Sequence, residues 1–141
     1  MKRISGLFVF LIVLQSMHLQ MQAQENHNKE AQKIFSRFEE GMTTGAVDKF
    51  SKYFASRTYL SFINGVSGYY SFDQSYYVVK DFLSINLPIS FKLTNVITET
   101  STPFAFGTLK YISSGIKGSA TVFISLQYIN KNWLISQVTI N

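Results

Sequence analysis

The carboxylates and histidines that a catalytic site would need are few in this 141-residue chain. Asp48 and Asp73 fall where acidic residues stabilise the start of a helix. Asp81 is typical of a solvated helix face, and Glu99 lies among turn residues. The segments that alternate like strands contain no His to activate a serine hydroxyl. The sequence therefore predicts no catalytic residue and a protein that is not an enzyme.

His27 is the one histidine after residue 23, and it has two interpretations. If the chain were cleaved after Gln24, the new terminus Glu25-Asn26-His27 would place an imidazole third from a free amine, a nitrogen set that suits Cu(II) or Ni(II). The alternative, which we favour, is a mobile polar terminus. We therefore predict no metal site. We also predict no cofactor, because the sequence has no Gly-rich phosphate loop or flavin fingerprint.

Aromatic residues are abundant, with 13 Phe, 8 Tyr and one Trp. Rings offer apolar area to a ligand, and tyrosine hydroxyls orient it. The alternative, more common for rings at structural spacing, is that they fill the core and leave no cavity. The candidates for ligand binding are Phe38, Tyr53, Tyr59, Tyr76, Tyr111 and Tyr128.

The N-terminus has the pattern of a signal peptide over residues 1–23. The basic pair Lys2-Arg3 precedes an apolar run at 7–14, and Ala23 marks the expected cleavage site. The run is shorter than the roughly 20 residues of a membrane-spanning helix. We therefore predict no transmembrane span, export to a periplasm or the exterior, and a single domain over 24–141.

The charge balance argues against a nucleic-acid partner. Loss of Lys2 and Arg3 would lower the formal net charge by two, from +5 to +3. Nucleic-acid readers usually present a clustered basic patch. The C-terminal half instead has four scattered lysines, Lys92, Lys110, Lys117 and Lys131.

Hydrophobic spacing predicts three helices. Apolar residues over 31–42 recur at the helical period, and a short second helix, capped by Thr44, extends to Phe54. Ser71-Phe72-Asp73-Gln74 has the pattern of a capping box that begins a third helix. Pro88 makes continuation of that helix past residue 87 unfavourable.

The rest of the pattern predicts strands. A hairpin over 58–63 and 66–70 turns at Asn64-Gly65, a dipeptide that suits two positive φ values. Four longer strands follow, at 89–98, 104–113, 118–129 and 133–140. One face of the third is apolar, and the other is mixed. The mixed face is open to solvent, covered by a partner or part of a dimer interface. It consists of Thr121, Phe123, Ser125, Gln127 and Ile129.

The order of elements resembles the nuclear-transport-factor-2-like superfamily. The resemblance rests on Gly45-Ala46-Val47-Asp48-Lys49-Phe50, on Ser51-Lys52-Tyr53-Phe54-Ala55 and on the ending over 132–140. It implies an α+β fold in which three N-terminal helices pack on a curved antiparallel sheet to form a cone.

A narrower resemblance is to the small exported bacterial proteins of domain of unknown function family 4783. It covers nearly the whole chain after residue 23 and implies fold and export without an activity. The motifs that carry it are Tyr70-Ser71, Lys80-Asp81-Phe82-Leu83, Pro88-Ile89-Ser90-Phe91 and Phe106-Gly107-Thr108-Leu109, with the last two strands.

The wider superfamily includes proton-transferring isomerases, and their chemistry does not carry over to this chain. The tyrosine of the steroid isomerases falls at Phe38, which has no hydroxyl, and their general-base aspartate falls near Phe62. A shared fold does not imply a shared activity when the reacting groups are missing.

Three classes of function remain. We favour a non-catalytic binding or interaction domain that holds a small apolar ligand in an aromatic-lined cone. The second class is a structural subunit of a cell-envelope assembly, joined as a homodimer or to another envelope protein through its sheet face. The third is an enzyme that acts on a small hydrophobic molecule with Tyr as its only polar catalyst.

Overall fold

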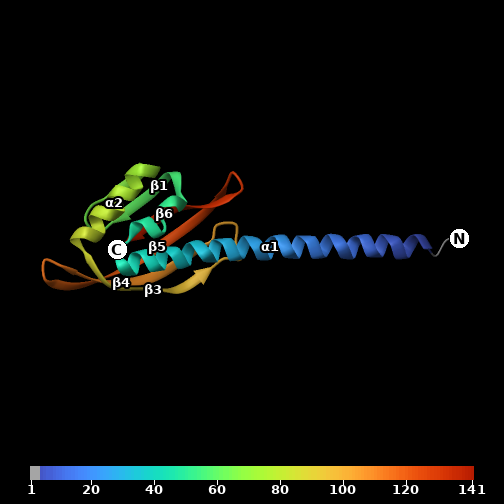
Figure 1. Ribbon diagram of the computed structural model, residues 1–141, viewed down its shortest axis with the longest axis horizontal. Helices are drawn as coiled ribbons and strands as arrows, with labels where there is room; N and C mark the ends of the chain where they lie inside the picture. The colour runs from blue at the N-terminus through green and yellow to red at the C-terminus, as the bar shows by residue number, and fades with distance from the viewer. Residues whose placement is uncertain (1–3) are drawn as a thin grey trace. The chain divides into compact units, whose positions relative to one another are not determined.

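The computed structural model describes residues 4–141, with side chains from residue 9 onward (Figure 1). The chain divides into two compact units, one ending at Glu30 and one over Ala31–Asn141. No helix among the described residues is both long and apolar enough to cross a membrane.

The elements are α1 (Ile4–Thr44), the 3-10 turns η1 (Val47–Lys49) and η2 (Ser51–Tyr53), β1 (Phe54–Phe62), β2 (Ser67–Ser71), α2 (Phe72–Ile85), β3 (Leu87–Ile97), β4 (Phe104–Ser113), β5 (Ile116–Ile129) and β6 (Asn132–Ile140).

One six-stranded sheet, in the order β2-β1-β6-β5-β4-β3, supports the second unit. Neighbouring strands are antiparallel except β1 and β6, which run parallel. The sheet is therefore mixed, and the prediction of a purely antiparallel sheet was wrong. The reason is topological: β3 to β6 form a meander, and its last strand returns beside β1, far away in sequence.

The described residues form two α-helices rather than the three that were predicted. The segment expected to be the second helix forms η1 and η2 instead, and Phe50, with a φ of −129°, interrupts the helical path between them. Thr44 does not cap this segment, because its hydroxyl donates to the Glu40 carbonyl at 2.9 Å. Val47 and Phe50 are both buried, and their separation of three residues is the spacing on which the helix prediction rested.

The start of α2 was correctly predicted. The Gln74 amide donates to Ser71 Oγ at 3.3 Å, and the Ser71 amide donates to Gln74 Oε1 at 3.0 Å. These two bonds satisfy amide groups that have no partner inside the helix. The helix ends at Ile85, before Pro88, as expected.

The hairpin at Asn64-Gly65 differs from its prediction, because only Gly65 has a positive φ, +93°. The Gly65 amide donates to the Phe62 carbonyl at 3.0 Å, and Asn64 Oδ1 accepts from the Val66 amide at 3.3 Å. Pairs of positive φ values, the pattern of tight two-residue turns, occur instead between the later strands. They lie at Ser114-Gly115 and Asn130-Lys131.

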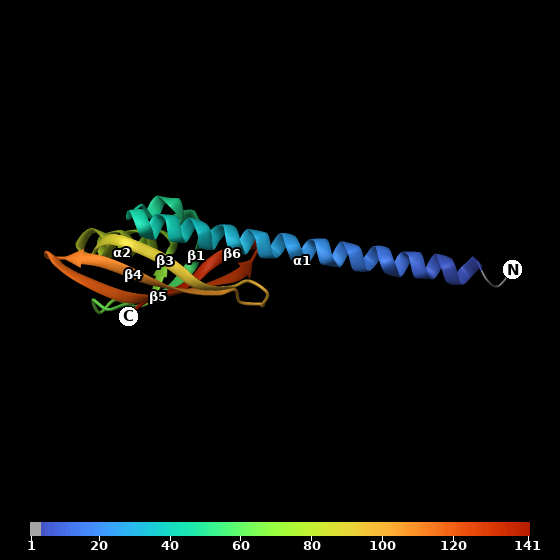
Figure 2. The same ribbon diagram turned by 90° about the horizontal axis from the view of Figure 1, so that it is seen from below.

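The core joins the part of α1 after residue 30, α2 and one face of the sheet. Figure 2 shows α2 and this part of α1 on the same side of the strands. The Phe38 ring meets the Phe50 ring edge to face, with centroids 4.8 Å apart, and the Phe91 ring at 5.8 Å. Phe62 of β1 contacts Phe82 of α2 at 5.1 Å. Interlocking rings of this kind contribute more than their buried area alone.

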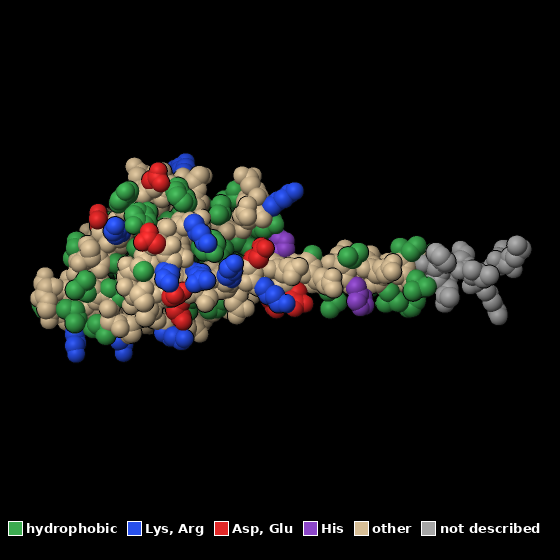
Figure 3. Space-filling view, in the orientation of Figure 1, with side chains coloured by type: hydrophobic (Ala, Val, Ile, Leu, Met, Phe, Trp, Pro, Cys, Tyr) green, Lys and Arg blue, Asp and Glu red, His purple; other side chains and the backbone are tan. Residues whose placement is uncertain are grey.

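Side chains of α1 also cover part of the sheet edge at β3. Glu39 Oε2 accepts from the Leu93 amide at 2.7 Å, and the Thr43 hydroxyl donates to the Phe91 carbonyl at 3.0 Å. These bonds occupy strand groups that would otherwise pair with another chain. Acidic and basic side chains mix on the face seen in Figure 3. Hydrogen bonds from Lys49 and Arg37 lower the pKa of Glu40 below its usual 4.5.

Candidate functional site

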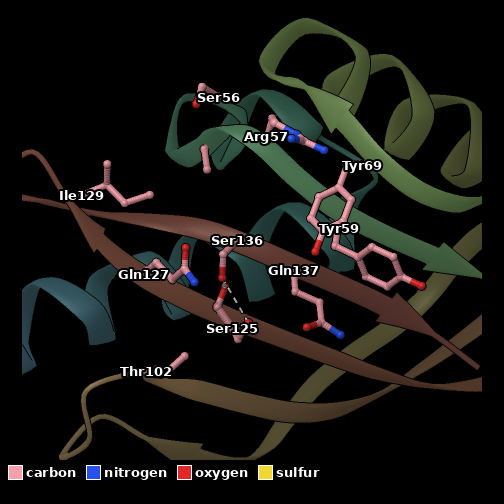
Figure 4. A pocket seen from close by; sticks show the side chains of 11 residues that line it. Ser56, Arg57, Tyr59, Tyr69, Thr102, Ser125, Gln127, Ile129, Ser136 and Gln137 are labelled. Atoms are coloured by element: carbon pink, nitrogen blue, oxygen red, sulfur yellow. Dashed lines mark hydrogen bonds between the residues drawn. The ribbon is translucent and has the colours of Figure 1, made fainter.

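A groove of about 820 Å³ lies on the outer face of the sheet, the face opposite to the buried core residues (Figure 4). Its lining comes from four strands and the loop before β4. Such a volume is in the range of small-molecule sites. The lining residues are Ala55, Ser56, Arg57, Tyr59, Tyr69, Thr102, Ser125, Gln127, Ile129, Ser136 and Gln137.

An irregularity in strand pairing places polar side chains on the floor of the groove. Ser125 pairs with Gln137, but the next residue of β5, Leu126, pairs with Ile135, so Ser136 is an extra residue in β6. Bulges bend the strand and redirect side chains. Ser136 and Gln137 consequently both line the groove, although they are adjacent in sequence.

Internal hydrogen bonds order this floor. Ser136 Oγ donates to the Ser125 carbonyl at 3.2 Å and also lies 3.2 Å from Ser125 Oγ. On the other side of β5, the Leu126 amide donates to the Pro103 carbonyl at 2.8 Å and continues the pairing of β5 with β4 by one residue. This bond holds the loop that carries Thr102 against the groove. A ligand would therefore meet a floor and one rim that are already in place.

The opposite wall is aromatic and carries the only charge in the lining. Tyr59 and Tyr69 are cross-strand partners whose ring centroids lie 5.3 Å apart, at an interplanar angle of 62°. The Arg57 guanidinium lies over the Tyr69 ring, 4.8 Å from its centroid. Stacking on a ring holds a guanidinium by cation–π attraction while its edge stays available for hydrogen bonds.

The groove is chemically suited to binding and lacks common proton-transfer groups. Its eleven lining residues include no Asp, Glu or His, the side chains that most often transfer protons near neutral pH. They do include hydroxyls and amides that both donate and accept hydrogen bonds. Among the described residues, no group of three His, Cys, Asp or Glu is placed to hold a metal ion.

The six aromatic residues predicted to bind a ligand do not gather at one place. Phe38 is fully buried in the core, and Tyr59 lines the groove on the other face of the sheet. Tyr53, Tyr76 and Tyr111 are partly buried against the core. Tyr128 is 44% exposed beside Trp133, with ring centroids 5.0 Å apart. A shared ligand-binding role for the six stays a prediction.

Sequence reasoning missed Arg57 and Tyr69 and found part of the floor. Ser125, Gln127 and Ile129 all belong to the mixed strand face that alternation had identified. Arg57 was overlooked because the first strand was expected to begin at Thr58, whereas β1 begins at Phe54. Tyr69 was missed because a two-residue turn at Asn64-Gly65 would pair Tyr59 with Tyr70, whereas the observed register pairs Tyr59 with Tyr69.

Comparison with known proteins places this fold among others of undefined activity. No curated protein matches the chain. A DUF4783 protein from Bacteroides ovatus is 21% identical, with a TM-score of 0.65 over 74% of this chain and 90% of that one. Another from Bacteroides uniformis is 17% identical, with a TM-score of 0.68 over 75% and 94%.

A third solved structure extends the likeness to the wider superfamily. It is an NTF-2-like protein of unknown function from Shewanella oneidensis, 12% identical, with a TM-score of 0.55 over 79% of this chain and 96% of that one. At these identities the likeness shows the fold alone. The model of the DUF4783 family, a domain of unknown function, matches residues 35–141, which is most of the second unit. The chain therefore belongs to the DUF4783 family and has an α+β fold of the nuclear-transport-factor-2-like type.

Proposed function

We propose that this chain is an exported, non-catalytic binding domain whose binding site is the groove on the outer sheet face. The observation that carries the proposal is an ordered groove of about 820 Å³ whose wall holds the Arg57 guanidinium on the Tyr69 ring, without an ion-pair partner among the described residues. A ligand inside the cone, as the aromatic content suggested, would compete with the core rings for space. Phe38 and Phe50, for example, already contact each other at 4.8 Å. The groove is the better supported site.

Filling the groove with a large side chain tests this proposal. Gln127 is an exposed lining residue of β5, so Gln127→Trp should occupy the groove without disturbing the core. Native mass spectrometry of the protein, purified as the cells that make it export it, is expected to show a bound mass that the variant loses. Loss follows from steric exclusion, since an indole would take the volume that the ligand needs.

Thr121→Trp is the matched control. Thr121 is also exposed on β5, but it does not line the groove. It should keep the bound mass of the wild type. An adduct that survives in Gln127→Trp, or a wild-type protein without any adduct, would contradict the proposal.

A second candidate function is protein contact through the same outer face. Phe104, Phe106 and Phe123 form an aromatic cluster there, with ring centroids between 4.9 and 6.2 Å apart. Phe106 is 39% exposed. Exposed aromatic clusters are enriched at protein interfaces. The partner would be a second copy of this chain or another envelope protein.

The oligomeric state of a charge variant tests this second candidate. Phe106→Lys puts a charge into the cluster and is expected to weaken self-association by about tenfold or more, measured by light scattering during gel filtration. Ile116→Lys is the control, because Ile116 is 73% exposed in β5 and is not part of the cluster. Equal effects of the two variants would exclude the cluster as the contact.

A further inference from the structure

Arg57 is the feature of the groove that most restricts the identity of a ligand. No hydrogen bond or ion pair holds its guanidinium within residues 4–141, although it is stacked on Tyr69. By contrast, Arg37 is paired with Glu40 at 2.9 Å. A guanidinium presents a planar fork of donors that matches a carboxylate. Arg57 can therefore pair with one negatively charged group of a ligand at the aromatic wall of the groove.

The remaining polar groups indicate what that charge is attached to. Gln127, Gln137, Ser136 and Thr102 line the groove as uncharged polar groups. The two amides donate and accept hydrogen bonds, although one Gln137 N–H already donates to Thr139 Oγ1 at 3.2 Å. The Ser136 hydroxyl, which donates to Ser125, still has a lone pair that accepts. The ligand groups that match this dual character are hydroxyls and amides. Because the lining includes no Asp or Glu, it offers no carboxylate to pair with a cationic ligand.

The aromatic wall adds an apolar surface of limited depth. Tyr69 is 64% exposed, and the Tyr59 ring contacts the Tyr69 ring edge to face. An exposed ring beside hydroxyls and amides suits a ligand with one apolar face and polar edges. Pyranose rings have this character, because their C–H groups gather on the ring faces and their hydroxyls lie at the rim.

We infer that the groove binds a carboxylate-bearing saccharide, whose carboxylate pairs with Arg57 while its hydroxyls bond the floor. The inference rests on the proposed function and names the ligand class for the same site.

Calorimetric titration of the full-length protein with defined oligosaccharides tests the inference. The acidic probes are short oligomers of galacturonate, of mannuronate and of hyaluronan, and the neutral probe is the methyl ester of the galacturonate oligomer. At least one acidic probe is expected to bind. Esterification and Arg57→Gln should each weaken that binding by about tenfold or more, as expected for loss of a charged hydrogen-bonded pair.

Lys110→Gln is the matched control variant. Lys110 is an exposed cation of β4 outside the groove lining, so its removal changes the net charge by the same amount as Arg57→Gln. Binding should stay within about twofold of the wild type, because a distant surface charge is screened by salt. Equal losses in the two variants would mean non-specific attraction and overturn the inference.

Three further results would overturn the inference and separate its failure from that of the proposed function. If no acidic probe binds at millimolar concentration while the native protein still carries an adduct that Gln127→Trp loses, the saccharide class is wrong and the groove stands. Equally tight binding of a polyglutamate peptide would mean that a carboxylate is recognised without the sugar. Saccharide binding that Gln127→Trp leaves unchanged would overturn the groove as well.

Discussion

Phe38→Ala is expected to lower the free energy of unfolding by about 3–5 kcal/mol. Phe38 has no solvent-exposed surface, and its ring joins three parts of the fold. It lies on α1 and contacts Phe50, which follows η1, and Phe91 of the edge strand β3. Removing the ring loses its burial and two edge-to-face contacts, and it leaves a cavity that rigid neighbours fill only in part. Urea unfolding of the full-length protein measures the loss.

Phe72→Ala is the control for the same chemical change at a less buried place. Phe72 begins α2 and is 43% exposed, so its loss should cost no more than about 1.5 kcal/mol. Phe38→Leu should cost less than Phe38→Ala, and it keeps the comparison measurable if the alanine variant does not fold. Equal costs for Phe38→Ala and Phe72→Ala would show that the Phe38 ring has free space around it, as a ligand-lining role requires.

The strands and the capped helix were predictable because their signals are local. Alternation and flanking turn residues located β4 over 104–113 without error, and they placed the other three long strands within two residues at each end. The capping box of Ser71 and Gln74 depends on residues three positions apart. Each of these signals is contained within a few neighbouring residues, so it can be recognised without knowledge of the tertiary structure.

The parallel pairing of β1 with β6 and the two 3-10 turns were not predictable in this way. Both depend on where distant residues pack. The turn after α1 brings the Phe50 ring against Gly41, where an added Cβ would lie 2.4 Å from the ring. The three-residue spacing of Val47 and Phe50 indicates that both side chains are buried on one side of the segment. The same spacing fits an α-helix and two short 3-10 turns, so it does not distinguish them.

The groove was the least predictable feature, because no single segment contains it. Its floor arises from one extra residue, Ser136, in the pairing of β5 with β6. Its charged wall arises from the register of β1 with β2, which brings Tyr59 opposite Tyr69 and Arg57 beside them. Residue type alone placed Tyr59 and Phe38 in one candidate site, although the sheet separates them.

Gly107→Ala is expected to destabilise the fold by about 2–3 kcal/mol, although alanine is ordinarily the better strand residue. Gly107 lies on the buried face of β4. An added Cβ would lie 2.5 Å from the Lys92 carbonyl oxygen and 2.9 Å from the Phe91 ring. The carbonyl belongs to the backbone of the neighbouring strand, and Phe91 is held between this strand and Phe38. Neither group can withdraw without disturbing β3. Thermal and urea unfolding measure the effect.

Gly118→Ala is the matched substitution, and the comparison decides whether backbone contact is the cause. Gly118 lies on β5 opposite Tyr111, and an added Cβ would also approach within 2.5 Å, but of the tyrosine ring. Tyr111 is only partly buried, so its ring can rotate toward solvent. The cost should therefore stay below about 1 kcal/mol, within the range of surface substitutions. Similar losses of stability in the two variants would show that the β3 backbone shifts as easily as the Tyr111 side chain. The hydrogen bonds from Glu39 and Thr43 would then hold the edge strand less firmly than their geometry indicates.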